Sequence, residues 1–268
     1  MAKTTNLDYT ALNQNTWNLK LDSHLASEFY DLDGFLQGNT SLNSIELDLL
    51  GDIQGKRILH LQCHFGQDSM SMARMGAHVT GVDLSNRSVA KAQELADQLE
   101  LDCRFICCNV YDLPKHLDEE FDIVFTSYGT IVWLPDLDKW ASIVSRFLKP
   151  GGSFFYVDFH PLVYTMDDDM KGIHYPYFNE GPIVEEEQGT YADESAPITS
   201  TSVTWNHPLS DIVTNLMRHD LSIQSLQEFD YSPYNCFRNL KEEEPGKYRM
   251  VHHGKKLPMV LALGTQKS

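Results

Sequence analysis

Arg57-Ile58-Leu59-His60-Leu61-Gln62-Cys63-His64-Phe65-Gly66-Gln67-Asp68 is the stretch that decides the fold of this 268-residue chain. Its first five residues are mostly apolar, which predicts a buried β-strand over 57–61. The residues that follow lead to Gly66, which indicates a turn, and a helix is predicted over 67–75. A buried strand that passes through a short turn into a helix is typical of a parallel α/β sheet.

The alternation of strand and helix continues along the chain. Further strands are predicted over 78–82, 103–107, 121–125 and 153–157, with helices over 85–100 and 137–148. Ser85 is expected to cap the first of these helices, and Lys149-Pro150-Gly151-Gly152 to end the second. Apolar strands that alternate with helices predict an α/β fold with a doubly wound, mostly parallel sheet. Such a sheet binds ligands at the carboxyl ends of its strands.

The residues before and after this core follow other patterns. Helices are predicted over 8–30, 41–50 and 208–219, a hairpin over 182–191 with 199–205, and late strands over 221–229 and 257–263. No internal repeat and no clear linker divides the chain, so a single domain is expected. Its parts are a helical N-terminal lid (1–50), a cofactor-binding core (56–160), an inserted cover (161–206) and a C-terminal helix with strands (207–268).

Acidic residues outnumber basic ones, 38 against 21, which gives a formal net charge of −17. This charge disfavours binding to nucleic acid or to an anionic membrane surface, because both need an excess of Lys and Arg. No apolar stretch approaches the roughly 20 residues that span a bilayer. The first residues also lack the apolar core of a secretory signal. A small-molecule partner is therefore expected, without nucleic acid or membrane.

The cysteines indicate the compartment. They are Cys63, Cys103, Cys107, Cys108 and Cys236, an odd number without CxxC spacing. Buried, reduced thiols are the favoured interpretation, and a disulfide framework or a zinc site is the alternative. The expected location is therefore the cytoplasm.

Several kinds of site are disfavoured because their motifs are missing from the sequence. The late histidines show no HExxH or comparable spacing, so no metal centre is expected. The acidic runs 167–169 and 185–187 are interpreted as solvated faces and not as metal ligands. A GxSxG elbow and a Walker loop are also missing, which disfavours a hydrolase or a P-loop nucleotidase.

Polar side chains follow the strands at the positions where such a sheet binds ligands. Asp83 ends the second strand, and Asn109 follows the third. A carboxylate at the end of the second strand can accept hydrogen bonds from both hydroxyl groups of a ribose. An amide after the third strand can recognise an adenine amino group, with Val110 and Tyr111 beside the ring. This pattern predicts a nucleotide-like cofactor, and dehydrogenases share it.

Five sequence elements in register resemble the class I S-adenosylmethionine-dependent methyltransferases. They are the strand and turn that end at Gly66, Val82-Asp83-Leu84-Ser85, Asp112-Leu113-Pro114, Phe121-Asp122-Ile123-Val124 and Leu148-Lys149-Pro150-Gly151-Gly152. Together they cover about 56–160 in the order and at the spacing of the family. The resemblance implies S-adenosyl-L-methionine as the cofactor and a Rossmann-like sheet of seven strands whose last strand is antiparallel.

The first motif departs from the family pattern, which is roughly D-x-G-x-G-x-G. His60 stands in the place of the acid, and Gln62 and His64 stand in the places of the first two glycines. Larger side chains are expected to hold a ligand farther from the backbone or to require a reshaped turn. Alternatively, Gln62 and His64 can donate hydrogen bonds to the carboxylate of the cofactor. The variant is similar to the turn of a mainly bacterial branch of methyltransferase-like proteins.

The resemblance also implies which residues form the site. The cofactor-binding candidates are Trp17, Leu61, Gln62, Cys63, His64, Gly66, Gln67, Asp83, Leu84, Asn109, Val110, Ser127 and Tyr128. The N-terminal segment resembles the lid of small-molecule methyltransferases, so His24 and Tyr30 are candidates for the substrate pocket, with Trp133. Ordinary packing is the alternative role for Trp17 and Trp133.

His160, at the end of the fifth strand, is the candidate catalytic residue. A histidine there can act as a general base on a hydroxyl acceptor, since its ordinary pKa lies near neutrality. The alternative is that His160, followed by Pro161, only shapes the exit of the chain. Methyl transfer can also proceed by alignment in a closed pocket without any base.

The leading hypothesis is an enzyme, an S-adenosylmethionine-dependent methyltransferase that acts on a small molecule as a monomer or homodimer. Aromatic residues of the inserted cover, such as Tyr164, Tyr175 and Tyr191, suggest an apolar or planar acceptor, or a dimer contact. The second hypothesis is a methyltransferase-like fold that binds the cofactor or another ligand without catalysis. A nicotinamide-dependent oxidoreductase is disfavoured because the chain lacks the G-x-G-x-x-G turn.

Overall fold

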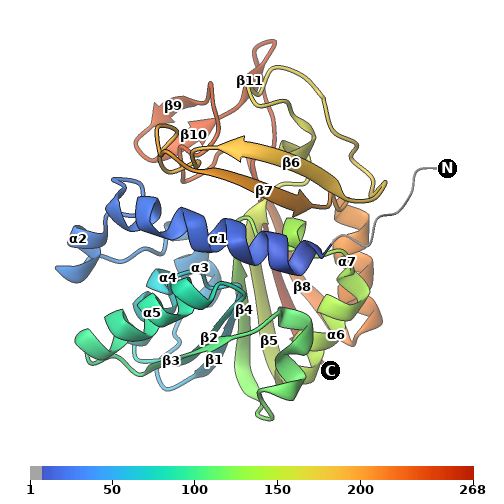
Figure 1. The fold of residues 1–268 in the computed structure, drawn as a ribbon. Helices are drawn as coiled ribbons and strands as arrows, with labels where there is room; N and C mark the ends of the chain where they lie inside the picture. Colours follow the sequence, from blue (N-terminus) through green and yellow to red (C-terminus); the bar gives the residue numbers. More distant parts are fainter. Residues whose placement is uncertain (1–7) are drawn as a thin grey trace.

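Residues 8–268 are described by a computed structural model, and positions 1–7 of the expected lid lie outside the described residues. One large sheet is formed by β1 (Arg57–Leu61), β2 (His78–Asp83), β3 (Cys103–Cys107), β4 (Phe121–Ser127), β5 (Leu148–Phe159), β8 (Leu221–Phe229) and β13 (Val260–Lys267). Its order is β3-β2-β1-β4-β5-β13-β8 (Figure 1). β13 runs antiparallel to β5 and β8, and the other neighbours are parallel. The predicted sheet is confirmed.

Helices cover both faces of the sheet. They are α1 (Tyr9–Ala26), α2 (Leu32–Leu36), α3 (Ser44–Leu50), α4 (Gln67–Arg74), α5 (Asn86–Gln98), α6 (Leu137–Phe147) and α7 (Leu209–Arg218). Alternate strand residues point to opposite faces, so Ile58 packs with side chains of α3, α4 and α5. Its neighbour Leu59 packs on the other face with Trp140 of α6 and Leu216 of α7.

Helix caps explain where the helices that border the site begin. The Ser85 side chain accepts a hydrogen bond from the Ser88 N–H at 3.0 Å, which confirms the predicted cap of α5. Asp136 does the same for Lys139 at the start of α6. The predicted strand over 153–157 is too short, because residues 148–152, expected only to end the helix, already belong to β5.

α1 lies across the carboxyl ends of the strands, between the large sheet and a hairpin of β6 (Ile183–Gln188) and β7 (Thr199–Thr204) (Figure 1). The Asn13 side chain donates to the Val203 carbonyl and accepts from its N–H, at 2.8 and 2.9 Å. On the side of the sheet, the Gln14 amide donates to the Leu84 carbonyl at 2.9 Å. The hairpin was predicted, but its docking on α1 was not.

Two elements have other bounds than the sequence predicted. The helix expected over 8–30 stops at Ala26, and Asp31, with a left-handed φ of 40°, caps the separate helix α2. The strand expected over 257–263 is β13, which starts at Val260. The loop before it contains short strands, β9 (Lys241–Glu244), β10 (Lys247–Arg249), β11 (Val251–His252) and β12 (Lys255–Lys256). Among the described residues, no helix is long and apolar enough to cross a membrane.

Candidate functional site

Two adjoining hollows lie over the carboxyl ends of the strands. A large cavity of about 880 Å³ extends from the turn after β1 to the hairpin, and a small pocket of about 120 Å³ lies over the end of β2. The residues that line both are Trp17, Tyr30, Gln62, His64, Tyr128, Gly129, Trp133 and Tyr191. Helix α1 and the hairpin thus enclose this edge of the sheet with aromatic side chains.

The turn after β1 has the backbone of a glycine-rich turn without its glycines. Gln62 and His64 have left-handed φ angles of 57° and 52°, and Gly66 has 82°. A left-handed conformation disfavours residues with a Cβ atom, so the surroundings must hold Gln62 and His64 in place. At Gly66 a Cβ atom would lie 2.7 Å from the Phe105 ring, which explains why glycine is retained there.

Asp83 at the end of β2 holds this turn. One carboxylate oxygen accepts the His64 N–H at 2.8 Å, and the other accepts the Ser85 N–H at 2.8 Å. Burial raises the pKa of Asp83 to about 6, although these backbone donors favour the charged form. The carboxylate therefore fixes the strained turn and borders the small pocket.

The side chains of the turn point to different partners. The Gln62 amide donates to the Thr130 carbonyl at 2.8 Å, and its Oε1 is buried without a partner among residues 8–268. His64 Nε2 shares a hydrogen bond with His24 Nδ1 of α1 at 2.8 Å. Burial lowers the pKa of His24 to about 3 and that of His64 well below its ordinary value, so both rings are neutral at pH 7.

Leu84, Asn109 and Val110 line the small pocket together with Asp83. The Asn109 Oδ1 accepts the Tyr111 N–H at 3.0 Å and caps a short helical turn. The Asn109 amide nitrogen lies 3.4 Å from the Thr10 hydroxyl. Both polar ends of Asn109 therefore have partners inside the chain, which the sequence did not suggest.

Buried carboxylates form the floor of the site, and sequence reasoning missed two of them. Asp68 accepts hydrogen bonds from the hydroxyl groups of Ser41 and Ser127, at 2.6 and 3.0 Å, and burial raises its pKa. Glu46 is 1% exposed, and its pKa rises to about 7 through burial and the nearby Asp68. Burial, and next the charge of Glu46, raise the pKa of the Tyr128 hydroxyl well above its ordinary value. In the sequence, only Asp68 could have been recognised as a site residue, because it directly follows Gln67 at the end of the turn after β1.

The predicted site residues fall into two groups. Those that line one or both hollows are Trp17, Tyr30, Gln62, Cys63, His64, Gly66, Gln67, Asp83, Leu84, Asn109, Val110, Ser127, Tyr128 and Trp133. Leu61 does not line them, because it is fully buried in the core. His24 is also fully buried, behind the ring of His64.

His160, the candidate catalytic residue, lies outside both hollows, and its catalytic role stays a prediction. Its Nε2 pairs with Glu228 of β8 at 2.8 Å, and its Nδ1 accepts the Leu162 N–H at 3.1 Å. Both ring nitrogens are therefore occupied within the chain. The bond to Leu162 fits the alternative reading, that His160 shapes the exit of the chain from β5.

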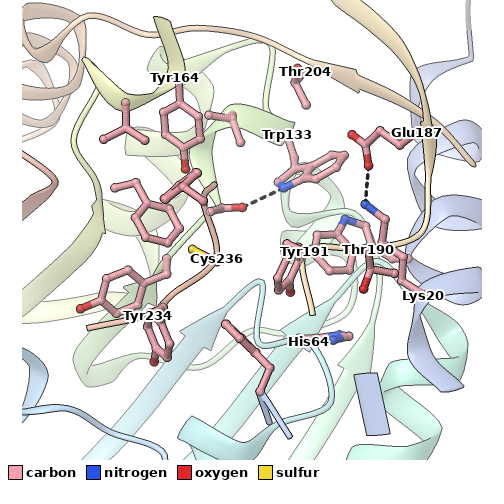
Figure 2. A pocket seen from close by; sticks show the side chains of 18 of the residues that line it. Lys20, His64, Trp133, Tyr164, Glu187, Thr190, Tyr191, Thr204, Tyr234 and Cys236 are labelled. Carbon is pink, nitrogen blue, oxygen red and sulfur yellow. Dashed lines mark hydrogen bonds and ion pairs between the residues drawn. The ribbon is translucent and has the colours of Figure 1, made fainter. Parts of the chain in front are cut away.

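The acidic run of β6 is only partly a solvated face. Successive strand residues alternate in burial, so Glu185 and Glu187 are half-buried and Glu186 is exposed, and all three line the large cavity. Glu187 pairs with the buried Lys20 of α1 at 2.8 Å (Figure 2). The interpretation of 185–187 as a solvated face is therefore wrong for these two residues.

Comparisons with known proteins agree with this geometry. Residues 58–152 match the methyltransferase domain family. The ubiquinone biosynthesis O-methyltransferase of Chromobacterium violaceum is 33% identical over 149 residues, which are 53% of this chain and 63% of that protein. The protein of the same name from Xanthomonas oryzae pv. oryzae is 35% identical over 136 residues, 49% of this chain and 56% of that protein. The chain thus spans about three fifths of the length of these curated relatives.

Solved structures show the same fold at low identity. An S-adenosylmethionine-dependent methyltransferase from Mesorhizobium loti has a TM-score of 0.58 at 19% identity, covering 87% of this chain and 100% of that one. Magnesium protoporphyrin IX methyltransferase from Synechocystis PCC 6803 has a TM-score of 0.55 at 14% sequence identity. The match covers 99% of this chain and 100% of that one. Residues 58–152 therefore match a methyltransferase domain, and the described chain has the fold of the S-adenosylmethionine-dependent methyltransferases.

Proposed function

We propose that this protein transfers a methyl group from S-adenosylmethionine to a small molecule. The observation that carries the proposal is the turn after β1, whose left-handed backbone is fixed by Asp83 beside an enclosed cavity. The names of the sequence relatives support it. When bound, S-adenosylmethionine supplies an electrophilic methyl group on its sulfonium.

The residues around the small pocket fit this cofactor. The Asp83 carboxylate is placed to accept ribose hydroxyl protons, and Leu84 and Val110 offer apolar walls for the adenine ring. The unpartnered Gln62 Oε1 is an acceptor, so it suits the ammonium group at the amino-acid end of the cofactor. The expectation that Gln62 donates to the cofactor carboxylate stays a prediction, because one N–H of its amide donates to Thr130 and the second N–H remains.

The large cavity is our proposed acceptor site. α1 and the hairpin cover it, which excludes water and aligns the acceptor without a general base. Trp17, Tyr128 and Trp133 line both hollows, so they border the place where cofactor and acceptor meet. Ser127 and Asp68 lie below them, with a 3.0 Å hydrogen bond between their side chains.

We further infer a single functional unit composed of lid, core, cover and C-terminal part, working as a monomer or homodimer. The hydrogen bonds from α1 to both β7 and the end of β2 support one unit. The net charge of −17 supports the absence of a nucleic-acid partner. All five cysteines are free, which supports a reducing, cytoplasmic location.

Isothermal titration calorimetry of the purified chain with S-adenosylhomocysteine tests the proposal. We expect saturable one-to-one binding, since the product shares the ribose, adenine and amino-acid groups of the cofactor. NADH, titrated in parallel, is expected to give no saturable heat. No S-adenosylhomocysteine binding up to about 1 mM would reject the proposed function.

A further inference from the structure

The large cavity has one acidic wall, which belongs to the segment that covers the strand ends. Glu185 and Glu187 of β6 face the cavity, and Asp168 lines it as well. Burial, the hydrogen bond to Glu185 and the charges of all three carboxylates raise the pKa of the Tyr175 hydroxyl. The three carboxylates therefore form one cluster on the cavity side.

Among residues 8–268, nearby cations leave two of these three carboxylates, Asp168 and Glu185, without an ion pair, while Glu187 is paired with Lys20. Lys20 is engaged with Glu187 at 2.8 Å, and Arg238 with Glu194 at 2.9 Å. Within residues 8–268, Asp168 and Glu185 have no salt-bridge partner closer than 4.0 Å. The Tyr175 hydroxyl donates to Glu185 Oε1 and leaves Oε2 free for a ligand. A hollow lined by one sign of charge concentrates ligands of the opposite sign.

The rest of the cavity is aromatic. Figure 2 shows Tyr164 and Tyr234 on the side away from Glu187, with the ring of Trp133 between the two sides. Aromatic faces attract organic cations as well as apolar groups. At the inner end, Tyr128 adds a further ring to the lining.

We propose that the methyl acceptor is a small organic cation whose ammonium group is held against Asp168 and Glu185 and whose apolar or aromatic body lies between the rings. A nucleophilic atom of that body, and not the charged nitrogen, takes the methyl group: its bond to the methyl carbon forms as the carbon–sulfur bond of the sulfonium breaks and S-adenosylhomocysteine leaves. This inference rests on the proposed methyltransferase function and narrows its substrate class. The cavity volume of about 880 Å³ accommodates a drug-sized molecule.

A series of ligands that differ only in charge tests the inference. Phenethylamine, 2-phenylethanol and phenylacetate are titrated into the full chain by calorimetry, with and without saturating S-adenosylhomocysteine. We expect the amine to bind about tenfold more tightly than the alcohol, and the anion more weakly than both. Added NaCl should weaken binding of the amine alone.

Matched variants locate the effect. Glu185→Gln removes the charge and keeps an oxygen for the Tyr175 hydroxyl, so we expect about a fivefold loss of phenethylamine affinity with 2-phenylethanol unchanged. Glu180→Gln makes the same change at an exposed position outside the cavity and should alter neither. Equal affinities for the three ligands, or no binding of any up to about 10 mM, overturn the inference.

The cofactor titration separates this inference from the proposed function. If S-adenosylhomocysteine binds and the amine shows no preference, the cation site is overturned and the methyltransferase proposal stands. If the amine is preferred and S-adenosylhomocysteine does not bind, the role of the cation as methyl acceptor is overturned.

Discussion

The carboxylates below the cavity and those on its cover differ in how they are held. Asp83 and Asp158, at the ends of β2 and β5, accept hydrogen bonds from backbone N–H groups of the neighbouring loops. On the cover, Glu185 accepts from a tyrosine hydroxyl, and Asp168 has no ion pair among residues 8–268. The lower carboxylates fix the shape of the site, and the upper ones set its charge.

The two groups of carboxylates also differ in how well the sequence reveals their roles. A carboxylate that accepts from the backbone acts within a few residues of a strand end, so its place in a motif reveals its role. A carboxylate on a cover acts through segments that are distant in the chain, as Glu187 does with Lys20. The following changes test that division.

The largest expected effect comes from a lower carboxylate that stabilises the loop after β4. Asp158 is fully buried and accepts from the Thr130 N–H and hydroxyl, at 3.0 and 2.9 Å, and from the Gly129 N–H. Asp158→Ala leaves these donors unsatisfied, so we expect about 3–4 kcal/mol lower free energy of unfolding in urea titrations.

The same substitution on the cover is the control. Asp168→Ala should change the free energy of unfolding by less than about 0.5 kcal/mol, since its side chain has no hydrogen-bond or ion-pair partner among residues 8–268. Similar losses for Asp158→Ala and Asp168→Ala would contradict the division between the two sets.

Glu46, another lower carboxylate, should make stability depend on pH. Burial raises its pKa from 4.5 to about 7, so the folded protein binds its proton more tightly than the unfolded chain does. Its contribution is fully present below about pH 4.5 and is lost as the pH rises through about 7. Glu46→Gln, with no proton to lose, should gain about 3 kcal/mol relative to wild type between pH 4.5 and 8.

Urea unfolding of wild type and Glu46→Gln across this range measures the gain. Glu186, an exposed residue of the cover, provides the reference. The free energy of unfolding of Glu186→Gln should differ from that of wild type by the same amount at every pH. If the difference between Glu46→Gln and wild type is also independent of pH, Glu46 has the same pKa in the folded and unfolded states, and the prediction is wrong.

The core of the fold was predictable because its signals are local. Apolar runs gave β1 to β4 within one or two residues, and Ser85 marked the start of α5. The break after Ala26 was missed because it depends on Asp31, a non-glycine residue in a left-handed conformation. Propensity alone does not reveal such a residue.

The part of the site at the strand ends was predictable from the sequence, and the part formed by α1 and the hairpin was less so. Asp83 and the turn residues Gln62 and His64 line the hollows as expected, although the glycine-type backbone of the turn could not be foreseen from their large side chains. Glu185 and Lys20 were missed because the docking of the hairpin on α1 places them. The contact of His160 with Glu228 was not foreseen, because the two residues are distant in the chain and Glu228 lies on β8.

Asp83→Asn should weaken S-adenosylhomocysteine binding by about a hundredfold, measured by calorimetry at pH 7. The amide has one acceptor oxygen where the carboxylate has two, and both carboxylate oxygens already accept backbone N–H groups. Because the pKa of Asp83 is about 6, wild-type binding should also weaken as the pH falls below 6. Asp97→Asn on the exposed side of α5 is the control. An equal loss of affinity in Asp97→Asn would contradict the assignment of Asp83 to the cofactor site.

The smallest effect concerns Gln62, whose free Oε1 is assigned to the ammonium group of the cofactor. Gln62→Met keeps the length of the side chain and removes the acceptor, so S-adenosylhomocysteine should bind about tenfold more weakly. 5′-Methylthioadenosine has the same ribose and adenine but no amino-acid end, so its affinity should not change. A parallel loss for both ligands would mean that Gln62 acts through the turn that it shares with His64, as the lower carboxylates do. A loss for S-adenosylhomocysteine alone would show that one side chain of this turn reads the ligand directly.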